Sequence, residues 1–136
     1  MMKGAMRVVA FIGRSNSGKT TLICGVVVHF VARGLRVAAI KHTHHPLNEE
    51  HRGDTGRFLD AGAMPVILAG EREAVVFEAN AARRIAIAGF GDLLQSVGEP
   101  DLVLVEGFKE HEGCPRIDAE RVRGIDEAIE LLDRIA

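Results

Sequence analysis

The eight residues GRSNSGKT, at positions 13 to 20, constrain the fold of this chain more than any other stretch. The continuous apolar run RVVAFIG, at 7–13, leads into it, and apolar residues at helical spacing follow it from about Gly18 to Arg33. A continuous apolar run is typical of a strand that is buried on both faces of a parallel sheet. A glycine-rich turn between such a strand and a helix is the arrangement that confirms a phosphate-binding P-loop.

The motif itself is G-x-x-x-x-G-K-[ST], with Gly13, Gly18, Lys19 and Thr20 at its fixed positions. A chain of this length would contain it by accident with a probability on the order of one percent. Glycines let backbone N–H groups converge on phosphate oxygens, and a helix N-terminus favours negative charge. We expect Lys19 to reach the β- and γ-phosphates and to stabilise the transferring charge, and the Thr20 hydroxyl to help hold Mg²⁺. The motif therefore predicts a nucleoside phosphate site.

The remaining segments predict a three-layer α/β domain, P-loop NTPase-like, with a mostly parallel sheet. The strand LRVAAIK, at 35–41, completes a right-handed β-α-β unit. MPVILAG and EAVVFEA flank a two-residue turn closely enough to predict a β-hairpin. Three further helices are expected in DTGRFLDAGA (54–63), GFGDLLQSVG and GIDEAIELLDRIA, and another buried strand in DLVLVEG (101–107). A chain of 136 residues fits one such domain, spanning 1–136.

A P-loop needs an acidic side chain at the end of a neighbouring strand to complete its metal site. Glu106 ends one predicted strand and Asp101 begins it, and ligands of open α/β sheets collect at the carboxyl edge, so Glu106 is the better candidate. Asp54 follows the second strand and is a further candidate metal ligand, although it could equally be the N-cap of the helix that it precedes.

Four of the six histidines lie within ten residues, in a loop that follows the second strand: His42, His44, His45 and His51. A zinc site would need three or four ligands in tetrahedral geometry, and no cysteine lies near. The imidazoles could instead donate hydrogen bonds to anionic oxygens of a phosphorylated ligand. A third alternative is that they are exposed loop residues without a role.

The composition limits the partners of the chain. Its formal net charge is −2, so bulk electrostatics give no reason to expect binding to nucleic acid or to a membrane. No apolar run approaches the roughly 18 residues needed to cross a bilayer. The two cysteines, Cys24 and Cys114, are far apart and form no CxxC pair, which favours a reducing, cytoplasmic location.

The stretches GRSNSGKTTL, VAAIKHTHH, DTGRFLDAGA and DLVLVEGFKEHEGCPRID together resemble the MobB family of molybdopterin-guanine dinucleotide biosynthesis adaptor proteins. The resemblance implies a homodimeric P-loop protein that binds GTP with Mg²⁺, hydrolyses it weakly and works beside the nucleotidyltransferase MobA, with molybdopterin as a further candidate ligand. It implies that Glu106 belongs to the Mg²⁺ site and that the histidine loop borders the nucleotide or the pterin. The expected phosphate-binding residues are Gly13, Arg14, Ser17, Gly18, Lys19, Thr20 and Thr21.

This sequence departs from the family pattern in three places. Members have a Gly-Lys-Asp-Ser run, in a longer loop, where this chain has Arg52, Gly53, Asp54 and Thr55, so the acid and the hydroxyl are kept and the lysine is lost. The region between PRIDAERVRG and the last helix is short, and no N-K-x-D guanine motif occurs. A preference for GTP over ATP therefore rests on the resemblance alone. Arg14 directly follows the first glycine, where related dimeric P-loop proteins carry a lysine that contacts the partner's phosphates, so we hypothesise that Arg14 acts in trans.

Two alternative functions remain open at this point. A metal-delivery GTPase would use the loop from His42 to His51 to carry nickel or zinc. A small-molecule kinase would need an arginine lid over the phosphates, for which Arg83 and Arg84 are the candidates, although an exposed pair is the simpler interpretation of them.

Overall fold

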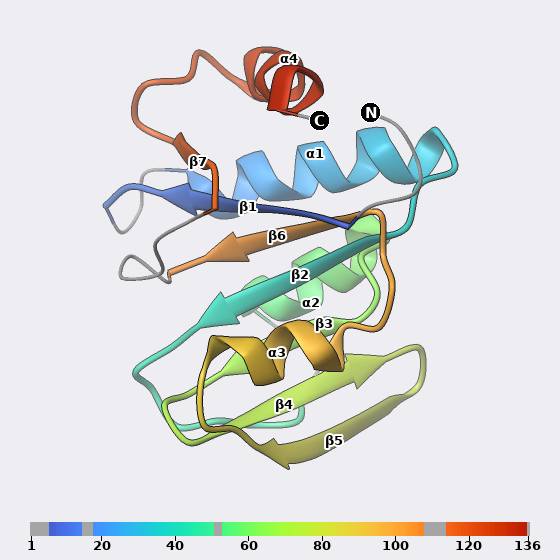
Figure 1. The fold of residues 1–136 in the computed structure, drawn as a ribbon, viewed down its shortest axis with the longest axis vertical. Helices are drawn as coiled ribbons and strands as arrows, with labels where there is room; N and C mark the ends of the chain where they lie inside the picture. Colours follow the sequence, from blue (N-terminus) through green and yellow to red (C-terminus); the bar gives the residue numbers. More distant parts are fainter. Residues whose placement is uncertain (1–5, 15–17, 51–52, 108–113, 136) are drawn as a thin grey trace.

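The computed structural model describes residues 6–14, 18–50, 53–107 and 114–135. These residues form one mixed sheet of seven strands with four helices packed against it (Figure 1). The strands are β1 Arg7–Ile12, β2 Val37–His42, β3 Val66–Ala69, β4 Glu73–Glu78, β5 Ala81–Ala86, β6 Leu102–Glu106 and β7 Arg116–Asp118. The helices are α1 Lys19–Ala32, α2 Gly53–Ala61, α3 Phe90–Ser96 and α4 Ile125–Ile135.

The sheet has the order β5-β4-β3-β2-β6-β1-β7. The pairs β1–β6, β1–β7, β2–β3 and β2–β6 are all parallel, and only β4 runs against its neighbours. In this register Glu106 of β6 stands opposite both Phe11 of β1 and Lys41 of β2. The carboxyl ends of the three central strands therefore lie side by side, and the P-loop, Glu106 and the histidine loop leave the sheet at one edge.

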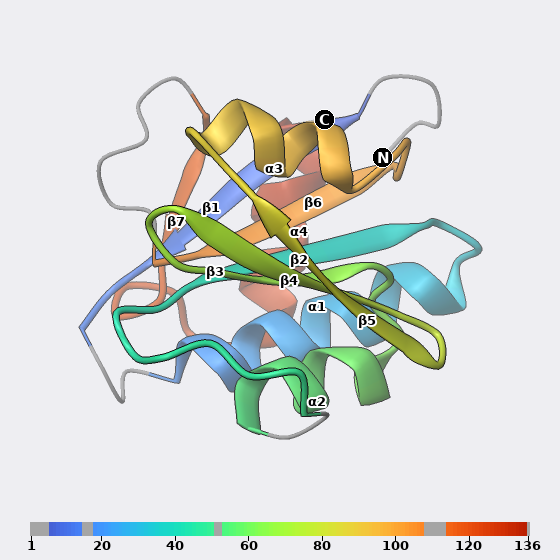
Figure 2. The ribbon, with the colours of Figure 1, turned by 90° about the horizontal axis from the view of Figure 1, so that it is seen from below.

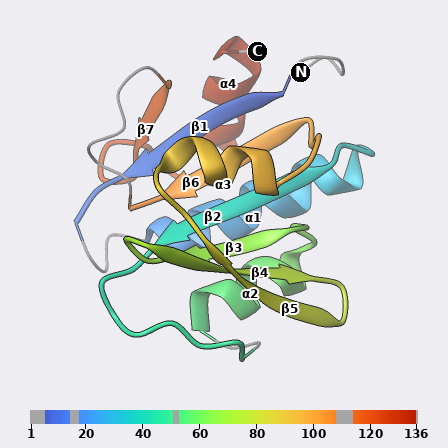
Figure 3. The same cartoon turned by 60° about the horizontal axis from the view of Figure 1, so that its bottom comes forward.

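The sheet separates two apolar cores, which gives the three layers that the sequence predicts (Figure 2). Helices α1, α2 and α4 cover one face, where Phe30 of α1, Phe58 of α2 and Leu132 of α4 are fully buried. Helix α3 covers the other face next to β6, through Leu93 (Figure 3). The central strands are apolar except at their ends, as expected for strands that are buried on both faces.

The predicted hairpin is confirmed as β3 and β4, which join through Gly70–Arg72. Strands β5 and β7 are not predicted by the sequence. In β5, AARRIA, polar and apolar residues do not alternate, because Arg83 and Arg84 follow each other. Nearly all residues of this strand are exposed. β7 has only three residues and pairs with β1 alone. No helix among the described residues is long and apolar enough to cross a membrane.

Gly25 lies in the middle of α1 where α4 packs against it. A β-carbon at position 25 would lie 2.3 Å from Cδ1 of Ile125 and 2.7 Å from its Cγ1. Both distances are far below van der Waals contact, so the missing side chain sets how closely α4 approaches α1.

We expect Gly25→Ala to lower the free energy of unfolding by about 1–2 kcal/mol, because overpacking outweighs the gain of about 1 kcal/mol in helix propensity. Denaturant unfolding measures this. Ile125→Ala removes the obstructing side chain, so in that background the same substitution should be neutral or stabilising. An equal loss in both backgrounds would contradict this account of the packing.

Candidate functional site

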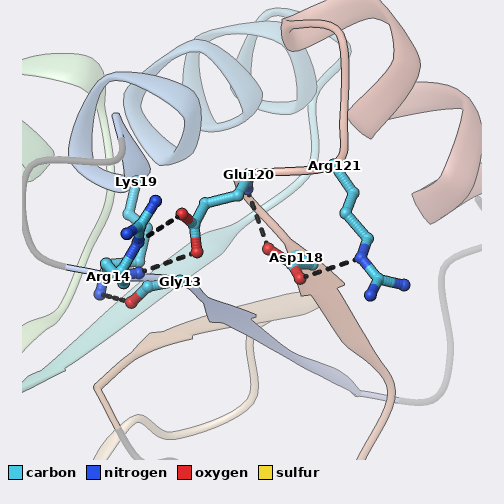
Figure 4. A network of polar contacts seen from close by, with 6 residues as sticks. All are labelled: Gly13, Arg14, Lys19, Asp118, Glu120 and Arg121. Atoms are coloured by element: carbon cyan, nitrogen blue, oxygen red, sulfur yellow. Dashed lines mark hydrogen bonds and ion pairs between the residues drawn. The ribbon is translucent and has the colours of Figure 1, made fainter.

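The P-loop joins the end of β1 to the start of α1, and its two described ends are linked by Lys19. The Lys19 ammonium donates a hydrogen bond of 2.8 Å to the carbonyl oxygen of Gly13 (Figure 4). Gly18 caps the helix with φ +87°, a left-handed conformation that suits glycine. The structure thus places Gly13, Gly18, Lys19 and Thr20 around one loop, while Ser17 lies outside the described residues.

Glu106 is the centre of a chain of polar contacts at the carboxyl edge of the sheet. Its side chain is only 6% exposed, and one oxygen, Oε1, accepts a hydrogen bond of 3.1 Å from the Thr20 hydroxyl. The other oxygen, Oε2, lies 2.9 Å from the Lys41 ammonium, which also binds the carboxylate of Asp54. The structure therefore brings together the three residues that the sequence proposes as metal ligands, Thr20, Glu106 and Asp54.

Asp54 lies within the first turn of α2, which begins at Gly53. Its carboxylate contacts Lys41, on a different element, and points toward the P-loop side of the sheet edge. Of the two interpretations of Asp54, a site residue and a helix N-cap, the geometry favours the site residue.

The sequence does not predict a role for Lys41, although it is the one acidic or basic residue in the otherwise apolar first five positions of β2. Burial disfavours its ammonium form, but hydrogen bonds to Asp54 and Glu106 outweigh burial and raise the pKa of Lys41 above its ordinary value. Lys41 therefore stays positively charged at neutral pH. Two carboxylates that would otherwise repel each other are held together by this one cation.

Two cavities open at this edge. The smaller, of about 450 Å³, lies over the start of α1 and is lined by Gly18, Lys19, Thr20, Thr21, Lys41, Asp54, Arg57 and Glu106. The larger, of about 660 Å³, lies toward α3 and the histidine loop. Lys19, Lys41 and Glu106 line both, so the two cavities meet at these side chains.

The larger cavity has a mixed wall. His42, His44 and His45 all line it, as the sequence predicts for residues that leave β2 beside the P-loop, and Phe90 and Leu93 of α3 add apolar surface. The rings of His42 and His44 are 4.7 Å apart between centroids, in an edge-to-face arrangement. The cavity can accept a ligand with both a flat and a polar part.

The histidines do not form a metal site in the part of the chain that the structure describes. Within it, no three histidine, cysteine, aspartate or glutamate residues come close enough to hold a metal ion. His51 lies outside the described residues. The metal-delivery alternative therefore receives no support from the described geometry.

Arg83 and Arg84 do not lie over the phosphate site. Both are on β5, where Arg84 binds the carboxylates of Glu49 and Glu73 and Arg83 lies 3.4 Å from Glu78. Neither lines the smaller or the larger cavity. Because these guanidinium groups bind carboxylates of Glu49, Glu73 and Glu78, Arg83 and Arg84 do not form the arginine lid that the kinase alternative needs.

Arg14 is held by the segment that follows β7, a contact that the sequence does not predict. Its Nε lies 2.8 Å from Oε1 of Glu120, and its backbone N–H donates to Oε2 at 3.3 Å (Figure 4). The backbone N–H of Glu120 in turn donates to Asp118 Oδ1 at 2.9 Å, and Asp118 pairs with Arg121. The Arg14 hydrogen bonds lower the pKa of Glu120 below its ordinary value.

Arg57 is a second residue that sequence reasoning missed. It extends from α2 into the smaller cavity, where its Nη2 donates a hydrogen bond of 3.1 Å to the Thr21 hydroxyl. It adds a positive charge beside the start of α1. The only available signal in the sequence was its place three residues after Asp54 on the same predicted helix.

Known proteins resemble this chain over most of its length. The family model for MobB, molybdopterin guanine dinucleotide synthesis protein B, matches residues 8–134. The chain is 38% identical over 118 residues to the molybdopterin-guanine dinucleotide biosynthesis adapter protein of Haemophilus influenzae, covering 85% of this chain and 64% of that protein. It is 34% identical over 112 residues to the Escherichia coli protein of the same name, covering 81% and 63%.

The chain thus spans a little less than two thirds of the length of these relatives. Among solved structures, the crystal structure of Bacillus subtilis MobB has a similar fold, with a TM-score of 0.54 and 24% identity over 96% of this chain and 74% of that one. The confirmed three-layer fold, the G-x-x-x-x-G-K-[ST] sequence motif and the family match over nearly the whole sequence lead to one conclusion: the chain belongs to the MobB family.

Proposed function

We propose that this protein is a nucleotide-binding adapter in molybdopterin-guanine dinucleotide biosynthesis, which binds GTP with Mg²⁺ and hydrolyses it slowly. The observation that carries the proposal is the convergence of Lys19, Thr20 and Glu106 on the cavity at the start of α1. The place in the pathway is supported by its similarity to the molybdopterin-guanine dinucleotide biosynthesis adapter proteins of two bacteria. The preference for GTP over ATP is supported by family resemblance.

The charges of the smaller cavity suit a metal–nucleotide complex. Three cationic side chains, Lys19, Lys41 and Arg57, face two carboxylates, Asp54 and Glu106, which leaves a net charge of one positive unit. Mg²⁺ would raise this to three positive units, and a nucleoside triphosphate carries several negative charges. The complex therefore fits better than either component alone.

The donor set at Glu106 fits Mg²⁺. Thr20 offers a hydroxyl and Glu106 and Asp54 offer carboxylates, and oxygen is the ligand atom that Mg²⁺ prefers. The Lys41 ammonium lies between the two carboxylates, so this position already accommodates a cation. When bound, Mg²⁺ would polarise the phosphate oxygens and neutralise developing charge.

The remaining side chains would bind and orient the nucleotide. Backbone N–H groups from Gly13 to Thr21 would contact phosphates, and Lys19 would leave the Gly13 carbonyl to meet the β- and γ-phosphates. Water would be the nucleophile. Both carboxylates that line the smaller cavity, Asp54 and Glu106, would be ligands of Mg²⁺ in the loaded protein, so neither would be free to position that water, which supports slow turnover.

We further propose that the larger cavity and its histidines receive the second ligand of the adapter, such as molybdopterin, or the nucleotidyltransferase MobA that uses it. Molybdopterin combines a flat pterin with a phosphate group, and the wall combines apolar α3 side chains with His42, His44 and His45. The protein would act as a homodimer in the cytoplasm, with no role for nucleic acid or membrane.

The nucleotide site can be tested by calorimetric titration of GTP and ATP, each with and without Mg²⁺. We expect GTP to bind in the presence of Mg²⁺ and Lys19→Ala to weaken it about 10- to 100-fold, the usual effect of losing a charged hydrogen bond. Arg83→Ala is the matched control, because it removes one exposed positive charge that lines neither cavity. The proposal fails if neither nucleotide binds more tightly than about millimolar.

Arg14 is part of this proposal as a phosphate-contacting residue that acts in trans. Within one chain it is engaged by Glu120, so it would have to leave that carboxylate to reach a partner subunit. Its side chain is 87% exposed, and within the described residues its ion-pair partner is Glu120. The hypothesis is contradicted if Arg14→Ala hydrolyses GTP as fast as the unmodified protein at concentrations at which it dimerises.

The Glu120 carboxyl reports on the position of Arg14. In the free protein we expect its pKa, followed by carbon-13 NMR, to lie below the ordinary value of 4.5, and to return toward it in Arg14→Ala. Since the folded-state pKa is lowered, the contact stabilises the fold above the unfolded pKa and is lost as the pH falls through the folded one. Arg121→Ala is the control, because Arg121 pairs with Asp118 instead. An unchanged pKa in Arg14→Ala would show that Arg14 does not hold Glu120.

A further inference from the structure

Lys41 lies in the proposed metal site, although it is not part of the P-loop motif and has no role in the proposed function. Its ammonium group binds Glu106 and Asp54, the two carboxylates proposed here as metal ligands, and its side chain is only 23% exposed. The third donor, the Thr20 hydroxyl, hydrogen-bonds to the other oxygen of the same Glu106 carboxylate. One positive charge thus sits among all three oxygen donors of the metal site.

An ammonium group and a divalent cation cannot share these carboxylates without strong repulsion. Two positive charges a few ångströms apart repel each other substantially in a half-buried site, where the effective dielectric constant is well below that of water. Binding of the metal therefore requires the Lys41 ammonium to move. Lys41 has a flexible stem at the end of β2, and it lines the larger cavity as well as the smaller one.

We propose that Lys41 is a built-in competitor of the metal: it holds Glu106 and Asp54 together in the metal-free protein, and a divalent cation displaces it toward the larger cavity. The inference rests on the proposed Mg²⁺ site. In this view both the metal ligands and Lys41 determine the affinity for the metal. Metal alone then binds weakly, and tight binding needs the phosphates of the nucleotide as further ligands.

Removal of Lys41 changes the affinity for the metal in opposite directions, depending on whether Lys41 competes with the metal or positions its ligands. If Lys41 only positioned the two carboxylates, its removal would loosen the ligands and weaken metal binding. If Lys41 competes with the metal, its removal strengthens metal binding, because the two carboxylates are left without a counter-ion.

The test is the binding of Mn²⁺ alone to the full chain, without nucleotide, followed by the loss of the electron paramagnetic resonance signal of free Mn²⁺. We expect Lys41→Met to bind Mn²⁺ at least about tenfold more tightly than the unmodified protein. Lys41→Arg keeps the charge and should bind as weakly as the unmodified protein. Circular dichroism and thermal unfolding of each variant establish that it is folded.

Arg57→Met is the matched control. It removes one positive charge from the same cavity, but Arg57 donates to Thr21 rather than to the carboxylates. Equal tightening in Arg57→Met and Lys41→Met would overturn the proposal, since the effect would then be one of net charge. Unchanged or weaker Mn²⁺ binding in Lys41→Met would also overturn it.

A second readout follows the displaced group directly. In protein labelled with nitrogen-15 lysine, the Lys41 ammonium signal should shift when Mg²⁺ is added, whereas an unshifted signal at saturating Mg²⁺ would refute the displacement. If no variant binds Mn²⁺ at about 10 mM, competition is refuted as well. Nucleotide titration with Lys19→Ala is independent of these results, so the nucleotide site could stand while this inference falls.

Discussion

The ion pair between Lys41 and Glu106 is the contact on which the arrangement of the site depends. It joins the carboxyl ends of β2 and β6, and through Asp54 it fixes the start of α2 against the same edge. Without a cation at this position, two carboxylates would face each other in a half-buried site, and their repulsion would separate the elements that carry them. A parallel sheet provides the place, because it collects the ends of its central strands at one edge.

This architecture explains why so much of the site was predictable. The P-loop, Glu106 and the histidine loop each follow an apolar strand, and apolar strands are evident from a continuous hydrophobic run. Once the strands are assigned as parallel, their carboxyl ends must meet, whatever their order in the sheet. Thr20 and Glu106, 86 residues apart, hydrogen-bond for this reason.

Other features were not predictable because they depend on contacts between residues that have no local pattern. In the sequence, Lys41 is only a polar residue near the end of a strand. It can bind two carboxylates because the strand register places it opposite Glu106 and because Asp54 lies next to it. Glu120 and Arg57 are ordinary charged residues in the sequence, yet they engage Arg14 and Thr21 at the P-loop. β5 is held by backbone pairing with β4 and by exposed ion pairs rather than by burial, so it leaves no hydrophobic signal.

The segment from β7 to α4 contacts the strand before the loop at 13–20, the start of that loop and the helix after it. β7 pairs with β1 up to Ile12, Glu120 binds Arg14, and Ile125 packs against Gly25 on α1. These contacts form only when residues 116–125 are available, roughly a hundred residues after the loop has left the ribosome. During synthesis β1 would then be an edge strand with an incompletely anchored loop. The surroundings of the loop are therefore completed late in translation, when the segment from β7 to α4 becomes available.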